Sequence, residues 1–345
     1  MYSEIEGQKP VVVSRNHNAR IRPALYRWTM PPDWNPVWNR QRSYITGAFS
    51  GLVSALYLHA YEPARDILRF YQGPENLTQL KTFVSELVKM ENFRQGFLGK
   101  LGFYSLYGLS YEASRFYMWH DYAAGFPHEK SSVDVTWPKK FFTSITVGLL
   151  TSWIPVPFHN VMMRYRQDQI LPTEFKRGYR SPLHAAYTIA RKDGLFPFVR
   201  SAGPIMAEHT ASTFGLFFFL DFFKDKARHL RNFGGDFDQY SDTFLKFVCV
   251  SLGTYLSLFH AYPFRSLRLW VEELPTNANG EVLFRNYAEA FWKVMSDDVN
   301  MTQLWNGFHR YLARAGPPLF ATIWVADGFG LTPVSTFPTI WVAED

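Results

Sequence analysis

Six apolar stretches, each about the length of a helix, alternate with more polar segments along the chain. They come in pairs: 44–61 with 97–116, 141–155 with 202–223, and 244–262 with 311–329. Most are about long enough to cross a bilayer as helices, although polar residues interrupt several of them. Such interruptions are expected if a bundle encloses a wet cavity, because one helix face then meets water and the other meets lipid. The alternative reading is a soluble helical array.

A shorter amphipathic segment lies between the members of the second pair. Residues 183, 186, 187 and 190 form one apolar stripe at helical spacing. Pro182 stands at an early helical position, and Asp193-Gly194 follows as a stop signal. The counterpart in the third pair is 287–296. We therefore predict a surface helix between the two long helices of each of these pairs.

The chain repeats itself at an offset of 106 residues. Pro157-Phe158 returns as Pro263-Phe264, and the same offset relates four further pairs: Ser201 and Gly307, Ala207 and Ala313, Phe214 and Phe320, and Asp221 and Asp327. A weaker third copy opens at Pro63. One offset held over so many positions indicates duplicated structure. We therefore predict three units of roughly one hundred residues, the first with a shortened surface segment.

Composition narrows the class of protein. Aromatic residues make up 18% of the chain, and the net charge is +6. Aromatic rings of this abundance suit membrane interfaces and protein contacts. The mean hydropathy of −0.17 is low for a protein buried in lipid. The lysines and arginines are scattered, with no basic run that would follow a phosphate backbone, so nucleic-acid binding is not expected.

The same residues argue against an enzyme. The single Cys249 excludes an internal disulfide and a thiolate metal cluster, and its apolar surroundings in the sequence predict an inert buried thiol. We find no glycine-rich phosphate loop, no metal-ligand spacing and no nucleophile elbow. We expect no metal and no cofactor.

The order of the repeated motifs resembles the mitochondrial carrier family, over residues 43–330. In that family each odd-numbered helix ends in Pro-x-acidic-x-x-basic, and a glycine-containing turn precedes each even-numbered helix. The matching turns read Asp193-Gly194 through Pro204 in the second unit, Leu304 through Gly307 in the third and Phe93 through Gly96 in the first. Gly47 and Gly51 lie four residues apart in the first helix, where the family places small residues for close helix contact.

The resemblance implies a matrix-side gate, and this chain departs from its pattern. The family places acidic-basic ion pairs after the three prolines, which here are Pro63, Pro157 and Pro263. The acidic positions hold Arg65, His159 and Arg265, and the basic positions hold Leu68, Met162 and Arg268. None of the three ion pairs can form in the family's way, and two arginines would point toward one axis. Glu62 and Asp66 are the nearest acidic residues, but they face different sides of their helix.

The opposite gate matches the family only in part. Its acidic-x-x-basic pattern survives as Asp221 with Lys224, while Asp327 lacks its base because residue 330 is glycine. In the first unit the corresponding positions are Phe116 and Trp119. The sequence Glu112-Ala113-Ser114-Arg115 matches the acidic-x-x-basic pattern, but it lies about one helical turn before the expected positions. One complete pair predicts a weak lock, and the alternative is that Asp221 and Lys224 are an ordinary helix-surface pair.

Counting seven residues onward from the turn positions gives the cavity residues that the family resemblance implies. They are Phe103, Glu208 with His209, and Arg314. Glu208 and Arg314 occupy matching places in the second and third units, so we expect them to face each other across the axis. They either bind a polar solute or neutralise one another in a bundle that carries nothing, and the sequence favours the second interpretation.

These observations predict an all-α membrane protein with six transmembrane helices, arranged as three tandem repeats with pseudo-threefold symmetry. The expected divisions are an extended arm 1–42, repeat 43–120, linker 121–137, repeat 138–226, linker 227–242, repeat 243–330 and tail 331–345. Each X-Pro step in the arm resists helix, and the arm has no apolar run of a secretory signal.

The expected function follows from the departures at the gate. Alternating access needs two gates of similar energy, and a chain without matrix-side ion pairs lacks one of them. We therefore predict a multi-pass protein of the mitochondrial inner membrane that no longer transports and serves as a structural subunit of a respiratory-chain complex. Its expected partners are other membrane subunits and lipids, with cardiolipin as a candidate bound phospholipid. The alternative is a divergent, active carrier of a small polar metabolite that uses Glu208, His209 and Arg314.

Overall fold

The computed structural model of the chain describes residues 36–70, 90–124, 137–170, 174, 176–199, 201–232, 242–273, 287–296, 301–329 and 331. Within these ranges the chain forms helices and turns without a β-strand, in agreement with the predicted all-α class. The elements are α1 (Pro36–Phe70), α3 (Met90–Tyr107), the π-helical η1 (Gly108–Glu112), α4 (Ala113–Ala124), α5 (Trp137–Thr151), α6 (Pro155–Ile170), α7 (Pro182–Lys192), α8 (Phe196–Val199), α9 (Ala202–Asn232), α10 (Asp242–Glu273), α11 (Tyr287–Ser296), the 3₁₀-helical η5 (Met301–Trp305) and α12 (Phe308–Gly328).

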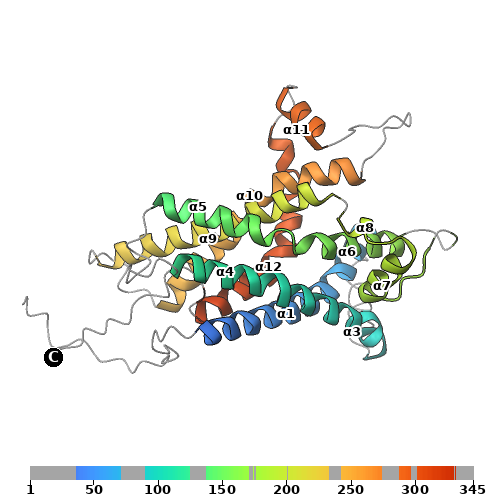
Figure 1. Ribbon diagram of the computed structural model, residues 1–345, viewed down its shortest axis with the longest axis horizontal. Coiled ribbons are helices and arrows are strands. Elements are labelled where there is room, and N and C mark those ends of the chain that lie inside the picture. Colours follow the sequence, from blue (N-terminus) through green and yellow to red (C-terminus); the bar gives the residue numbers. More distant parts are fainter. Residues whose placement is uncertain are drawn as a thin grey trace, which may run out of the picture. The chain divides into compact units, whose positions relative to one another are not determined.

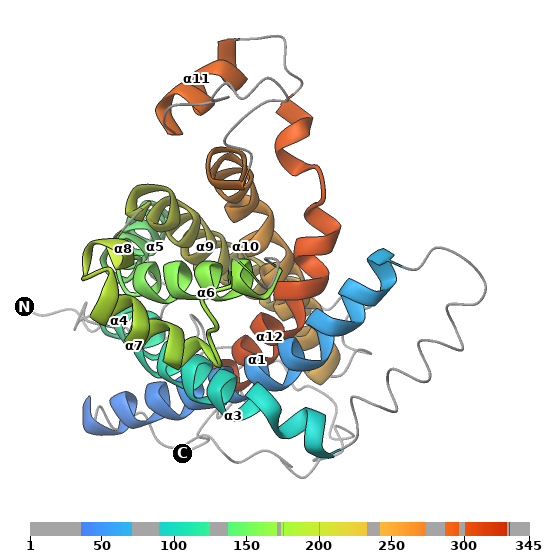
Figure 2. The ribbon, with the colours of Figure 1, turned by 90° about the vertical axis from the view of Figure 1, so that its right-hand side faces the viewer.

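The long helices pack as a closed ring in chain order. α1 packs on α3, η1 and α4; α4 packs on α5; α5 packs on α9; α9 packs on α10; α10 packs on α12; and α12 returns to α1. Figure 1 shows α1, α4, α5 and α9 running beside one another, and Figure 2 shows the same helices after a quarter turn. α11 packs against α10 outside this ring. A closed ring gives every long helix an inward face, which is what positions the site described below.

One described helix has the length and composition of a membrane span. Within residues 243–271 of α10, a window of 18 residues reaches a mean hydropathy of 1.4. Residues 138–151 and 155–168 are long and apolar enough for a span when they are taken together, but the two helices are bent by 55° at the break between them. Buried core helices of soluble proteins can have the same length and hydropathy. The six predicted spans and their threefold arrangement therefore stay a prediction.

Two prolines that were expected to interfere with helices do not end them. α1 begins at Pro36, so residues 36–42 of the predicted extended arm are helical. Proline is well tolerated at the first helical position, because its missing N–H has no helical acceptor there. In the third unit α10 runs on through Pro263 to Glu273. An interior proline removes one hydrogen bond, and the turns on either side still form.

The second unit is different, because its first long helix is interrupted. α5 ends at Thr151 and α6 begins at Pro155, with a turn over 152–154 between them. The amide of Ile154 bonds the Thr151 carbonyl at 3.1 Å, which is a tighter turn than an α-helix makes. Pro155 and Pro157 lack the N–H groups that would continue the earlier helical ladder. The apolar stretch 141–155 therefore forms most of α5 and the turn after it, and α6 begins only at its last residue.

Both predicted surface helices are present. The predicted stripe lies on α7, whose N-cap Ser181 accepts a hydrogen bond from the His184 amide at 3.1 Å. α7 ends before Gly194, which takes a φ of +80°. α11 spans Tyr287–Ser296, the predicted range. The boundaries of α7 follow from local capping by Ser181 and Gly194, and such capping residues can be recognised in the sequence.

Matching turns precede α9 and α12. Ser201 takes a φ of +58° and Gly307 a φ of +84°. The two residues lie 106 positions apart, so the sequence repeat is matched by the same left-handed backbone. Glycine adopts this conformation freely, whereas a side chain is strained in it.

We predict that Ser201→Gly raises the free energy of unfolding by about 0.5–1 kcal/mol, because relief of the strained φ outweighs the added freedom of the unfolded chain. Gly307→Ser should lower it by a comparable or larger amount. Thermal unfolding of the two purified variants beside the wild-type chain measures both. Equal signs for the two substitutions would contradict the explanation from φ.

The predicted close contact of the first helix is present. A Cβ at Gly51 would lie 2.5 Å from both the Ser105 Cα and the Tyr104 carbonyl oxygen, and Gly47 meets the backbone of Gly108 in the same way. α1 therefore touches the backbone of α3 and η1 directly. This contact positions the π segment, which contributes to the cavity.

Candidate functional site

A cavity of about 240 Å³ lies among the ring helices. Its walls come from α1, α3, η1, α4, α6, α9, α10 and α12. Seven residues singled out from the sequence line it: Phe103, His159, Met162, Glu208, His209, Arg265 and Arg314. All four predicted cavity positions thus lie at one place, together with three of the predicted gate positions.

Glu62 joins four helices at one boundary of the cavity. Its Oε1 accepts hydrogen bonds from Arg166 of α6 at 2.8 Å and from Arg314 of α12 at 2.9 Å. Its Oε2 lies 3.4 Å from Nζ of Lys100 on α3. Glu62 immediately precedes Pro63 on α1, so one carboxylate connects all three units close to the first of the repeated prolines.

Glu208 of the second unit plays a similar part, because it connects to the third unit. This carboxylate is buried on α9, and its Oε1 lies 3.3 Å from Arg265 while its Oε2 lies 2.9 Å from Arg268. Both arginines come from α10, directly after Pro263. Arg265 also stacks over the Tyr311 ring of α12, 4.6 Å from its centroid.

These contacts correct two sequence predictions. Glu62 and Asp66 were the acids named near the gate arginines, but Glu208 contacts both Arg265 and Arg268. Glu208 was also expected to face Arg314, whereas Arg314 pairs with Glu62. Counting along the sequence selected residues that line one cavity, but it did not determine which neighbouring helix each side chain reaches. The side chains of Pro63, Arg65 and Leu68 lie outside the described residues.

The cavity lining carries more positive than negative charge. Four arginines line it (Arg115, Arg166, Arg265 and Arg314), against the two carboxylates Glu112 and Glu208. Aromatic rings make up much of the remaining wall, with Phe103 edge-on to Phe158 and Tyr111 edge-on to His209. Such a chamber favours a small anion with some apolar surface.

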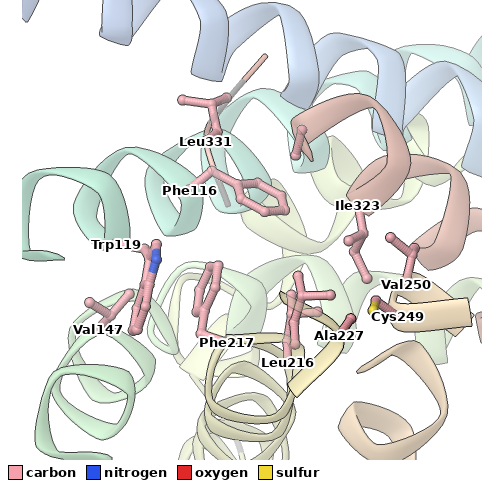
Figure 3. Close-up of a cluster of buried hydrophobic side chains, with 12 residues drawn as sticks. Phe116, Trp119, Val147, Leu216, Phe217, Ala227, Cys249, Val250, Ile323 and Leu331 are labelled. Atoms are coloured by element: carbon pink, nitrogen blue, oxygen red, sulfur yellow. The ribbon is translucent and has the colours of Figure 1, made fainter. Parts of the chain in front are cut away.

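Beyond the cavity, toward the opposite end of the same helices, lies an apolar core. Phe116 and Trp119 of α4 pack on Phe217 of α9, with the Trp119 and Phe217 rings stacked 4.5 Å apart. Figure 3 shows these rings together with Leu216, Val250 and Ile323, all buried. Cys249 is buried in this cluster, as predicted. Phe116 and Trp119 occupy the positions where the family resemblance implied a gate pair.

A second layer of ion pairs lies alongside this core, where Leu220 and Ala227 flank Asp221 and Lys224 on α9. Lys140 of α5 pairs with Asp221 of α9, and Lys224 of α9 pairs with Asp327 of α12. Lys246 of α10 lies 3.2 Å from the other Asp327 oxygen. All of these groups except Lys246 are at most 6% exposed.

This layer overturns the interpretation of Asp221 and Lys224 as a helix-surface pair. Both residues are buried, and each makes an ion pair with a different helix. The base that the sequence lacked at residue 330 is supplied by Lys224 and Lys246, so Asp327 has two lysine partners. Lys140 and Lys246 were missed because they lie on α5 and α10, the first long helices of their units, where the family pattern places no gate residue.

Glu112 and Arg115 lie between these two ion-pair layers. Glu112 closes the π segment η1 and Arg115 follows in the first turn of α4; the two pair with each other, and both are buried. They line the cavity instead of joining the outer ion-pair layer. The Tyr111 hydroxyl lies 3.2 Å from Thr213 Oγ1 of α9, which sets their depth in the ring.

A separate ion cluster holds the segment between α6 and α7. Asp193 lies 2.6 Å from Arg164 and 2.9 Å from Arg177. Hydrogen bonds from Arg177 and Arg164 lower the pKa of Asp193 below its ordinary value. The buried Asp168 accepts the amide of Tyr179 at 2.9 Å in the same segment. This cluster fixes the surface helix and does not line the cavity.

Replacing Asp193 with Asn should destabilise the fold slightly at neutral pH and have no effect in strong acid. A lowered folded-state pKa stabilises the fold above the ordinary Asp pKa of about 4, and this contribution is lost as the pH falls through the folded value. Thermal midpoints of wild type and variant should therefore differ at pH 7 and converge in acid, once the pH lies below the lowered folded-state pKa of Asp193. A difference that persists in acid would show that the ion pairs are not its cause.

Comparison with known proteins gives relatives over part of the chain. No family model matches. The chain is 25% identical over 179 residues to the mitochondrial 2-oxoglutarate/malate carrier protein of Homo sapiens, and equally to that of Mus musculus; these matches cover 52% of this chain and 54% of each relative. A Neurospora crassa protein named for the same carrier is 23% identical over 186 residues, 54% of each chain. The chain thus spans about half the length of the curated relatives it matches.

Proposed function

We propose that this chain, a member of the mitochondrial carrier family, lies in the mitochondrial inner membrane and carries a small organic anion through its central cavity. The observation that supports this most directly is the surplus of arginines over carboxylates in that cavity. Its relatives are named as carriers of 2-oxoglutarate and malate, both of which are small organic anions. The proposal includes the six transmembrane helices predicted from the sequence.

The two ion-pair layers support a transport cycle. Alternating access needs a closure on each side of the binding site, and each closure must be weak enough for a solute to open it. Glu62 and Glu208 supply carboxylates on one side of the cavity, and Asp221 and Asp327 supply them on the other. The cavity lies between the two pairs of carboxylates, as a carried solute requires.

Arg314 provides the direct test. It lines the cavity and pairs with Glu62 at 2.9 Å, so it belongs both to the binding site and to one closure. In liposomes that hold the purified full chain, we expect saturable exchange of malate or 2-oxoglutarate. Arg314→Ala should abolish that exchange. Arg191→Ala, which removes an exposed arginine on α7, should leave the exchange unchanged.

The second candidate is the transport-incompetent subunit of a respiratory-chain complex predicted from the sequence. This candidate rested mainly on the absence of ion pairs at the matrix-side gate. Glu208 forms ion pairs with Arg265 and Arg268, so this support is weaker in the third unit. The predicted arm 1–42 and tail 331–345 lie largely outside the described residues. Wild-type liposomes without exchange of any carboxylate, together with stable co-purification of other membrane proteins in mild detergent, would favour this candidate over the carrier.

A further inference from the structure

The π segment η1 lies between α3 and α4, and it changes which residues of α4 face the cavity. A π turn holds an extra residue, which rotates everything that follows relative to a straight α-helix. η1 is pinned in place because Gly108 approaches the backbone of Gly47. Glu112, its last residue, and Arg115, in the turn that follows, both line the cavity. The acidic-x-x-basic pattern at residues 112–115 lies about one helical turn, or about 6 Å, nearer the cavity than the gate positions 116 and 119.

Arg115 retains hydrogen-bonding capacity in this position. It is 2% exposed, and one of its terminal nitrogens donates to Glu112. Its guanidinium lies over the Tyr111 ring at 5.1 Å and beside the Phe116 ring at 5.4 Å. Its Nε has no hydrogen-bond acceptor among the described residues. A buried donor without an acceptor is unfavourable, and such donors in native proteins commonly await a water or ligand.

The depth of Arg115 separates it from the other cavity arginines. Tyr111 reaches Thr213, whereas Arg265 reaches Glu208, five residues earlier on α9. Five helical residues correspond to about 7–8 Å along the axis. The cavity therefore presents arginines at two depths, and Glu112 occupies the deeper one, nearer the apolar core.

We infer that Arg115 forms an anion-binding subsite, created by η1, that takes a carboxylate group of the solute in competition with Glu112. The planar guanidinium holds Glu112 through one nitrogen and offers Nε to an incoming carboxylate. Glu112 acts as the resident counter-ion that balances Arg115 when no solute is bound. This inference rests on the proposed carrier function and adds a specific residue pair to it.

The two single variants have opposite expected effects. Glu112→Gln removes the competing charge and should tighten the binding of malate to the purified full chain by at least about threefold. Arg115→Gln should weaken the binding by about tenfold or more, the usual effect of losing a hydrogen bond to a charged group. Isothermal titration in detergent, with malate, 2-oxoglutarate, citrate and aspartate as probes, measures both.

The double variant Glu112→Gln, Arg115→Gln guards against a folding defect. It removes both buried charges together, so it should unfold near the wild-type temperature and still bind as weakly as Arg115→Gln. If both single variants lower the unfolding temperature and leave the dissociation constants unchanged, the pair is structural and the inference is wrong. In that case, loss of exchange in Arg314→Ala would still support the carrier function. If the wild-type chain binds none of the four probes and exchanges none, the proposed function and this inference both fail.

Discussion

Replacing Glu208 with Gln is expected to lower the free energy of unfolding by about 3 kcal/mol. The carboxylate is 4% exposed and contacts two arginines of α10, one of which, Arg268, is fully buried. Removing one partner of a buried ion pair destabilises a protein by roughly 3–5 kcal/mol, because a desolvated charge loses its counter-charge. Gln keeps the size of the side chain, so the effect reports charge and not volume.

Asp193→Asn is the matched control for this substitution. Asp193 also contacts two arginines at comparable distances, but it lies at the surface, where water and salt replace much of the interaction. Thermal unfolding of both variants in the same detergent compares a buried carboxylate with an exposed one. Comparable losses in the two variants would mean that burial does not set the strength of the Glu208 cluster.

Four of the residues lining the cavity could be found from the sequence, but their partners could not. Repeat arithmetic identified Phe103, Glu208, His209 and Arg314, and all four line one cavity. It failed on pairing because it compared equivalent positions along the chain, whereas ion pairs form between neighbouring helices. Glu62 illustrates the difference. It was noted as a nearby acid, but which groups it meets depends on how α1, α6 and α12 pack.

The helices themselves were predicted with mixed success, for identifiable reasons. Surface helices with clear caps, such as α7, were placed closely, because a Ser N-cap and a following Asp-Gly act within a few residues. The break at 152–154 and the π segment η1 were not foreseen. Both depend on backbone packing, such as the approach of Gly108 to Gly47, and apolar periodicity does not record it. The helical start at Pro36 shows that a proline rule needs the position in the helix as well as the residue.

The contact between α1 and α3 yields the second large effect. Gly51→Ala should lower the free energy of unfolding by roughly 2 kcal/mol, because a methyl group there would lie 2.5 Å from backbone atoms of Tyr104 and Ser105. Backbone atoms cannot turn aside as a flexible side chain can, so the two helices must move apart. The gain in helix propensity from Gly to Ala, about 1 kcal/mol, only partly offsets this strain.

Gly203→Ala is the matched control for the helix-packing effect. Gly203 lies in α9 with no atom within 4 Å of the added methyl group, so only the gain in helix propensity remains. Gly203→Ala should therefore be neutral or stabilising by up to about 1 kcal/mol, while Gly51→Ala destabilises. Because Gly51 lies one turn from Gly47, which meets η1, separation of α1 from α3 should also shift the π segment. Gly51→Ala is thus expected to weaken malate binding as well as stability, and a Gly51→Ala protein as stable as Gly203→Ala would show that the helices do not touch there.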